Sequence, residues 1–294
     1  ITVATNTVTN GTRFFDYANG TAVGSTLTVN NNTMSGFGDN GIIIAGGTTI
    51  NVYSNTVTGA NTNDGIVVTP DTGATANIYS NSLTMGNGVS NTGINFSNGS
   101  VSMTGVQMNI YRNIITGSDI GIEIGTIDTN AGVLNVYNNV LYDLNSAGMS
   151  GNPGRMMANI FNNTVDNAPA AIDASDADGG EQLNIINNSL TDTGKSGTYV
   201  LLCGAAGEKI FNNHVSTYTN LNSSCATYSI GTQGNINVVP GYTDHTGNNF
   251  ALSATSTCSA AADNCDSGMA STTIFHAHVS SADSTSLVSA SDVA

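Results

Sequence analysis

The sequence predicts an all-β parallel solenoid, in which short strands of successive coils stack on one another. The first observation is a repeated phrase: LNVYNNVLYD (134–143) returns as ANIYSNSLTM (76–85), MNIYRNIITG (108–117) and further copies. The second is a period of about 25 residues, which is typical of solenoids and propeller blades. The third is that the copies are rich in β-branched residues, Asn and Gly, which are poor helix formers. Helical repeats are therefore disfavoured.

The first two strands of each coil are predicted from the last Asn of each phrase, which we call the anchor. An aliphatic residue lies three positions before each anchor and another lies two positions after it. Stacking these positions in register gives two short strands with inward aliphatic side chains and a continuous core. The anchors are Asn6, Asn32, Asn55, Asn81, Asn113, Asn139, Asn163, Asn188 and Asn213.

The anchor itself is predicted to form the corner between these two strands. Asn tolerates the left-handed backbone conformation that a tight corner needs. Its amide is also able to bond to the Asn of the coils above and below, as in stacked Asn ladders. We therefore expect a corner ladder of Asn side chains along the solenoid.

A third strand is predicted about ten residues after the anchor, where a second apolar patch recurs. The connections vary in length, and the long gap before Asn113 predicts a loop inserted around 97–106. We expect the β-helix to cover residues 1–237 and a capping or connector segment to cover 238–294. The patches are Gly41–Ile44, Gly65–Val68, Gly93–Phe96, Gly121–Ile124, Ala171–Ala174 and Tyr199–Leu202.

Composition excludes two classes of partner. Only 9% of the residues are charged, the formal net charge is −15, and there are five Lys and Arg residues. Nucleic-acid binding needs clustered basic residues that neutralise phosphates, so it is not expected. No apolar run approaches the roughly 18 residues that a membrane helix requires, so membrane insertion is not expected either.

Four cysteines occur, all in the last third of the chain. An even number fits disulfides in an exported protein. We expect Cys203 to pair with Cys225 across neighbouring coils and Cys258 to pair with Cys265 in a small loop. The chain begins at Ile1, already inside the repeat, which indicates a processed or cropped chain. The expected location is extracellular or the cell surface.

The Asn-Asn corners, the Gly-Ile strands and the coil length resemble the right-handed parallel β-helix repeat proteins of the pectate-lyase-like superfold. Residues 238–263 are similar to the closing segment of many exported bacterial members. They keep Pro240, Tyr242, Phe250, Leu252 and Cys258 of that pattern, although Ser256-Thr257 replaces its Ser-Pro. The resemblance implies a single right-handed β-helix of about nine to ten coils with an irregular, disulfide-containing C-terminal segment. It does not fix a function, because the superfold hosts lyases, hydrolases, adhesins and passive surface proteins.

The resemblance raises the question of catalysis. Lyases of the superfold use clustered Arg or Lys, often with calcium, whereas the basic residues here are scattered. Hydrolases use paired carboxylates, and Glu123 and Asp173 share one repeat position, ten residues past an anchor, with Asp16. We expect Glu123 and Asp173 two coils and roughly 9–10 Å apart, with Met149 between them. Outward acids on a solvated sheet are the simpler interpretation, so we lean against an enzyme.

Calcium is the one cofactor that the sequence brings into question. Asp173, Asp176, Asp178 and Glu181 fall within nine residues together with two glycines. Hard cations prefer several oxygen ligands on a flexible loop. The spacing is not that of an EF-hand, and an acidic loop is also an ordinary surface feature of an exported protein.

Two outward stripes are predicted on one face of the solenoid. Stacked rings stabilise their own ladder, but the stripes also suit sugar rings, a neighbouring subunit or the C-terminal segment, because a long apolar stripe in water needs cover. The aromatic stripe, two positions before the anchors, is Tyr53, Tyr79, Tyr111, Tyr137, Phe161 and Phe211. The amide stripe, four positions before them, is Asn51, Asn77, Asn109, Asn135, Asn159 and Asn184.

Our leading hypothesis is an exported, non-catalytic structural protein that forms a surface or filament subunit. We expect self-association end to end through the solenoid ends or along the aromatic face. The low charge, the regular ladders, the open first coil and the lack of a recognisable catalytic constellation favour it. One alternative is a carbohydrate-active enzyme, a glycoside hydrolase rather than a polysaccharide lyase, acting through Glu123 and Asp173. The other is a glycan-binding adhesin module that uses the aromatic stripe.

Overall fold

The computed structural model describes residues 1–18, 24–59, 63–86, 88, 90–96, 104–125, 132–151, 157–174, 182–192, 199–203, 209–211, 213–216, 220–222, 235, 242–244, 247 and 249–252. Every regular element within these residues is a β-strand. In this described part, no helix is long and apolar enough to span a membrane. The protein is a parallel β-solenoid over residues 2–216, as the sequence predicts.

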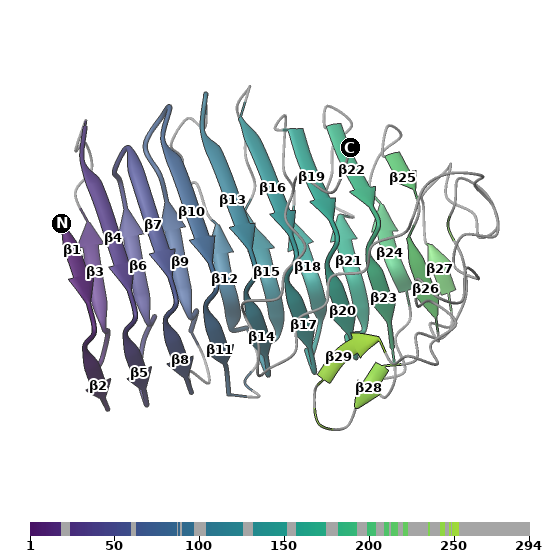
Figure 1. Cartoon of the computed structure of the whole chain (residues 1–294), viewed down its shortest axis with the longest axis horizontal. Coiled ribbons are helices and arrows are strands. Elements are labelled where there is room, and N and C mark those ends of the chain that lie inside the picture. The colour runs from purple at the N-terminus through teal and green to yellow at the C-terminus, as the bar shows by residue number, and fades with distance from the viewer. Residues whose placement is uncertain are drawn as a thin grey trace.

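The described strands form three nine-stranded sheets and one hairpin, and neighbouring strands within each large sheet come from successive coils (Figure 1). Sheet A contains β1 (Thr2–Ala4), β4 (Thr26–Asn30), β7 (Thr49–Tyr53), β10 (Thr75–Tyr79), β13 (Gln107–Tyr111), β16 (Val133–Tyr137), β19 (Met157–Phe161), β22 (Gln182–Ile186) and β25 (Lys209–Phe211). Sheet B contains β2 (Thr7–Thr9), β5 (Thr33–Ser35), β8 (Thr56–Thr58), β11 (Ser82–Thr84), β14 (Ile114–Thr116), β17 (Val140–Tyr142), β20 (Thr164–Asp166), β23 (Ser189–Thr191) and β26 (His214–Ser216). Sheet C contains β3 (Phe15–Ala18), β6 (Ile42–Ala45), β9 (Ile66–Thr69), β12 (Thr92–Phe96), β15 (Ile120–Ile124), β18 (Ala147–Gly151), β21 (Ala170–Ala174), β24 (Tyr199–Cys203) and β27 (Asn220–Asn222).

The register of sheet A places like residues on one another. Asn77 pairs with Asn51 on one side and with Asn109 on the other, and Tyr79 pairs with Tyr53 and Tyr111. All pairs in the three large sheets are parallel. Because side chains alternate between the two faces of a strand, this register creates one stripe for each strand position. The predicted stacking of repeat positions is confirmed.

The core is the continuous inner space between the three sheets. Val52 of β7, Ile78 of β10 and Ile110 of β13 are completely buried and belong to one hydrophobic cluster with residues of sheets B and C. The aliphatic positions three before and two after the anchors point inward, as predicted. Burial of these apolar side chains is the main driving force for stacking one coil on the next.

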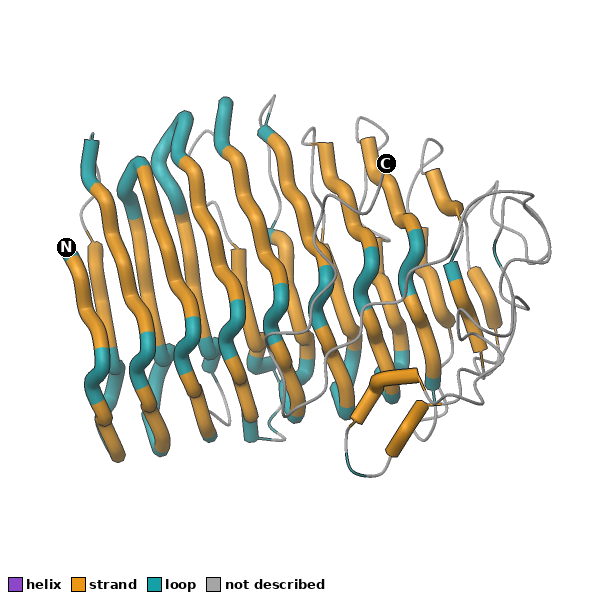
Figure 2. Tube along the Cα trace, in the orientation of Figure 1, coloured by secondary structure: helices purple, strands orange, loops and turns teal. Residues whose placement is uncertain are grey.

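The corner between sheets A and B corrects one prediction. The left-handed residue is the one before the anchor, as in Ser54 (φ 54°), Arg112 (φ 59°) and Asn138 (φ 56°). From Asn32 to Asn213 the anchor turns its side chain inward and is almost fully buried. Figure 2 shows these loop segments stacked in line along the solenoid. The two residues at each corner therefore have different roles. The residue before the anchor bends the backbone, and the anchor forms the ladder.

The predicted corner ladder is present and is buried. In each step the anchor donates from its backbone N and from Nδ2 to Oδ1 of the next anchor, as between Asn81 and Asn113, where both distances are 3.0 Å. The same Nδ2 also donates to a backbone carbonyl of the preceding coil, Val52 for Asn81. The ladder continues through Asn213 to Asn235, which the repeat pattern did not predict.

The C-terminal hairpin packs against sheet B. It consists of β28 (Tyr242–Asp244) and β29 (Asn249–Leu252) and lies beside β20 and β23 (Figure 1). The ring of Phe250 is 5.2 Å from the rings of Tyr142 and Tyr242, and Tyr242 Oη lies 3.1 Å from Ser189 Oγ. Phe250 and Tyr242 of the closing segment are thus docking residues.

Several predictions fall outside the described residues. Cys225, Cys258 and Cys265 lie there, and so does the side chain of Cys203 at the end of β24. Most of the predicted inserted loop, residues 97–103, lies there as well. The two disulfides and the loop therefore stay predictions.

Candidate binding face and acid column

The aromatic stripe forms a ladder on the outer face of sheet A. Successive ring centroids from Tyr53 through Tyr79, Tyr111 and Tyr137 to Phe161 are 4.8, 4.8, 4.9 and 4.9 Å apart, and the rings are within 9° of parallel. The rings are half-buried, since each covers its neighbour and leaves its edge in solvent. The predicted stripe is confirmed for these five residues.

The hydroxyl groups of Tyr79, Tyr111 and Tyr137 in this ladder stay protonated at neutral pH. Burial raises the pKa of Tyr79, Tyr111 and Tyr137 above the ordinary value, and it is the largest cause in each case. A protonated phenol both donates and accepts a hydrogen bond. The edge of the ladder therefore offers a row of neutral polar groups.

The amide stripe forms a second ladder beside the aromatic one. Nδ2 of each Asn donates to Oδ1 of the Asn in the preceding coil at 2.8–3.0 Å, from Asn184 through Asn159, Asn135, Asn109 and Asn77 to Asn51. These side chains are partly buried, whereas the corner anchors from Asn32 onward are almost fully buried. The outer face of sheet A thus joins an apolar row to an uncharged polar row.

The aromatic stripe changes at β22, whereas the amide stripe continues there through Asn184. Ile186 pairs with Phe161 and takes the aromatic position. A hollow of about 240 Å³ lies there, lined by Asn159, Phe161, Asn184, Ile186 and Asn187. Oδ1 of Asn187 is buried and has no hydrogen-bond partner in the described part of the chain. In the next strand Phe211 pairs with Ile186, and its side chain lies outside the described residues.

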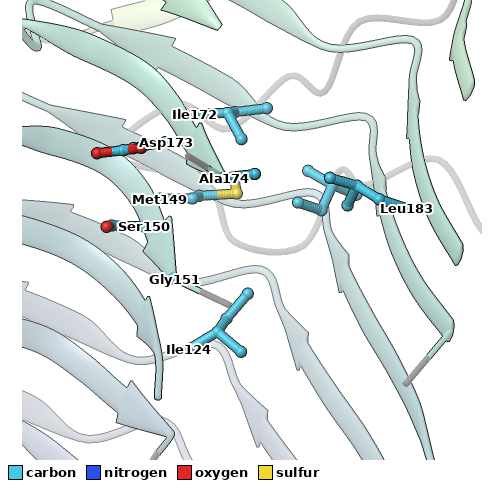
Figure 3. Close-up of a pocket in the computed structure, with 9 residues that line it drawn as sticks. Ile124, Met149, Ser150, Gly151, Ile172, Asp173, Ala174 and Leu183 are labelled. Carbon is cyan, nitrogen blue, oxygen red and sulfur yellow. The ribbon is translucent and has the colours of Figure 1, made fainter. Parts of the chain in front are cut away.

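The acid column on sheet C differs from its prediction in one residue. Glu123 pairs with Ser150, and Ser150 pairs with Asp173, so Ser150 and not Met149 lies between the two acids. Figure 3 shows Ser150 and Asp173 pointing away from Met149 and Ile172, which face the interior. Asp16 stands in the same column, opposite Ile43, but several strands away.

Ser150 takes the place of Met149 in this column because the connection before β18 contains one extra residue. The connection from β17 to β18 covers residues 143–146, whereas the connections before and after it cover 117–119 and 167–169. Because side chains alternate along a strand, counting ten residues from Asn139 in this coil reaches an inward position. The outward column is shifted by one, to Ser150.

Glu123 already has hydrogen-bond partners on the sheet. Its Oε2 accepts from Thr92 Oγ1 at 2.9 Å and from Asn95 Nδ2 at 3.3 Å. The same Asn95 Nδ2 donates to Asp64 Oδ2 at 2.8 Å. One amide therefore lies between two carboxylates, and the nearest acid partner of Glu123 in this network is Asp64. The repeat pattern gave no sign of Asp64, which precedes β9 and has no repeat position in common with Glu123.

Asp64 gives a pH-dependent prediction. Burial raises the pKa of its carboxyl above the ordinary value. The folded chain thus binds more protons than the unfolded chain between the two pKa values, so stability falls as pH rises through that window. We expect Asp64→Asn to have a higher urea midpoint than the parent at pH 7 and an equal one near pH 3. Asn95 Oδ1, buried without a partner, is free to accept from the new amide after rotation. A gain that is the same at both pH values would contradict the assignment.

A small interior cavity lies behind Asp173. Its volume is about 10 Å³, and Ile124, Met149 and Leu183 contribute to its lining (Figure 3). That is about the space of a single water molecule. It has no room for a substrate, so it adds nothing to a catalytic interpretation of Glu123 and Asp173.

The calcium prediction is not tested by the described residues. Asp176, Asp178 and Glu181 lie outside them, and Asp173 stands on β21. Among the side chains that are described, no group of three or more His, Cys, Asp or Glu residues is placed to hold a metal ion.

Sheet B carries a hydroxyl array that was not among the predicted stripes. Thr56 and Thr58 of β8 and Ser82 and Thr84 of β11 are exposed, with buried Val57 and Leu83 between them. The Thr-x-Thr pattern of the sequence was a usable signal, since alternate residues share a face. The hairpin occupies the other end of this face.

Comparison with protein-family models, with curated proteins and with solved structures finds no match for this chain.

Proposed function

We propose that this chain is an exported, non-catalytic structural β-helix whose outer sheet-A face contacts neutral glycans. The observation that carries the proposal is the pairing of a five-ring ladder with a parallel amide ladder on one face. The exposed ring edges form an apolar row that a sugar ring is able to cover, and amides hydrogen-bond to hydroxyl groups, so this apolar row beside an uncharged polar row suits a neutral sugar chain.

The finer architecture belongs to the same proposal. The solenoid is right-handed, has about nine to ten coils and lies outside the cell or on its surface, where Cys203–Cys225 and Cys258–Cys265 form. Its support is the resemblance of the repeat to exported bacterial β-helix proteins. Self-association end to end, or along the aromatic face, is the expected mode of assembly.

A structural role is favoured over catalysis by the surroundings of the acids. Glu123 and Asp173 are separated by Ser150 on a sheet face, and Glu123 accepts hydrogen bonds from Thr92 and Asn95. A general acid and base have to converge on one bond of a bound substrate. The hydrolase alternative predicts that Glu123→Gln abolishes turnover of a neutral polysaccharide, whereas our proposal predicts no turnover to abolish.

The test of the glycan face is a double substitution, Tyr79→Ala with Tyr111→Ala. We expect affinity for an insoluble neutral polysaccharide to fall about tenfold or more, which corresponds to about 1.4 kcal/mol. Pull-down isotherms on cellulose, chitin and mannan measure it. Thr56→Ala with Thr58→Ala is the control, because it removes two exposed side chains from sheet B and leaves the sheet-A face unchanged. Equal binding by both double variants would refute the glycan face.

Electron microscopy of the same sample tests assembly. Long fibres with an axial repeat near one solenoid length support end-to-end association. Short monodisperse rods would remove that part of the proposal and leave the glycan face standing.

A further inference from the structure

We infer that the hollow at Ile186 is a subsite for one pyranose ring at the end of a bound neutral glycan. This inference rests on the proposed function and makes it specific, because it names the place on the sheet-A face where one sugar ring inserts. The other places on that face are the edges of stacked rings. The hollow is where the stack is interrupted.

The hollow exists because an aliphatic side chain stands where the ladder calls for a ring. Ile186 lies directly next to Phe161 in register, and the preceding rings stack at 4.8–4.9 Å. One face of Phe161 is covered by Tyr137 at 4.9 Å. The opposite face has Ile186 as its neighbour, and about 240 Å³ remains open beside it. A ring-shaped ligand entering there continues the stack.

The rim of the hollow, as far as the structure describes it, is polar and uncharged. Asn159, Asn184 and Asn187 contribute amides around the apolar floor of Phe161 and Ile186. The amide stripe ends at Asn184, because the next strand has Lys209 in register with it. All three asparagines are only partly buried. An amide offers both donors and an acceptor, so the exposed parts of these side chains are able to bond to ligand hydroxyls.

These features favour a sugar ring over other occupants. A purely apolar ring would cover the three amides without forming hydrogen bonds to them. The free-energy cost of removing these polar groups from water would then oppose binding. An anionic ligand would meet a protein of net charge −15, and none of the lining residues that the structure describes is cationic. The volume is below the roughly 300–1,000 Å³ of pockets for drug-sized ligands, and so it suits a single ring.

The test is Ile186→Tyr, which extends the ladder and fills the hollow. We expect it to weaken binding of neutral hexasaccharides at least tenfold, measured by calorimetry with gluco-, xylo-, manno- and chito-hexaoses. The matched control is Asn30→Tyr. Asn30 pairs with Tyr53, so this change adds a ring at the opposite end of the ladder and leaves the hollow open. Saturation-transfer NMR with the corresponding methyl glycosides reports single-ring binding in the parent and in both variants.

The outcomes separate the two proposals. Loss of hexasaccharide binding in Ile186→Tyr but not in Asn30→Tyr supports the subsite. Binding that Ile186→Tyr leaves unchanged, while Tyr79→Ala with Tyr111→Ala weakens it, overturns the subsite and keeps the glycan face. A third outcome is that Ile186→Tyr alone abolishes methyl-glycoside binding, while Tyr79→Ala with Tyr111→Ala leaves polysaccharide binding unchanged. In that case the subsite stands and the glycan face is overturned. Absence of binding of every probe to the parent overturns both.

Discussion

Asn113→Ala is expected to destabilise the protein by about 2–4 kcal/mol, because it removes one complete step of the buried corner ladder. The side chain of Asn113 is fully buried. Its Oδ1 accepts from the backbone N and Nδ2 of Asn81, and its Nδ2 donates to the carbonyl of Ile78 and to Asn139 Oδ1, all at 2.9–3.0 Å. Alanine leaves two buried donors of Asn81 and one buried carbonyl without these partners.

Urea unfolding followed by circular dichroism measures this loss. The matched control is Asn109→Ala, four residues earlier in the partly exposed amide stripe, where water replaces the missing hydrogen bonds. We expect that change to cost about 1 kcal/mol or less. If the two alanine variants were equally stable, the buried ladder would not be the stronger contributor.

Asn113→Asp separates the contribution of the Asn113 acceptor, Oδ1, from that of its donor, Nδ2. A carboxylate keeps both acceptor functions toward Asn81 but loses both donors and turns negative charge toward the Ile78 carbonyl and Asn139 Oδ1. We therefore expect Asp to be at least as damaging as Ala at pH 7, since a buried unpaired charge is costly. Lowering the pH protonates the carboxyl and restores one donor, so part of the loss is recovered there.

Gly121→Ala is expected to destabilise the protein by about 3 kcal/mol through overpacking. A Cβ at this position of β15 would lie 2.5 Å from the backbone oxygen of Gly148 in the next coil and 3.1 Å from Leu144 Cδ1. Similar close approaches occur at Gly65 and Gly93, where the next glycine oxygen is 2.7 Å from the added carbon. Backbone atoms held in parallel sheets on both sides cannot move away cheaply.

The matched control for this substitution is Gly38→Ala. An added Cβ at Gly38 meets nothing within 4 Å, so alanine there is expected to be neutral or stabilising by up to about 1 kcal/mol, because it restricts the unfolded chain. Thermal unfolding of both variants measures the difference. A Gly121→Ala variant with the stability of Gly38→Ala would show that the coils separate more readily than their register indicates.

The sequence by itself determined the solenoid, the first two strands of each coil, most of the third strands, and the aromatic, amide and anchor stripes, although it missed the third strands β3 and β18. This was possible because each repeat carries the same residue types at the same spacing, and parallel in-register pairing converts that spacing into columns. The inward columns at Ile78 and Ile110, the rings at Tyr79 and Tyr111 and the anchors at Asn81 and Asn113 all follow from that one rule.

Only the tertiary structure decided features that depend on the length of a single connection or on contacts between distant segments. One extra residue before β18 placed Ser150 and not Met149 between Glu123 and Asp173. Asp64 reached Glu123 through Asn95, although no repeat position relates them. For the anchors up to Asn188 the backbone bend lies at the residue before the anchor, because the buried amide of the anchor has to face inward. The hollow at Ile186 likewise required the coordinates, since an aliphatic residue in an aromatic column leaves open space only when the neighbouring side chains do not fill it.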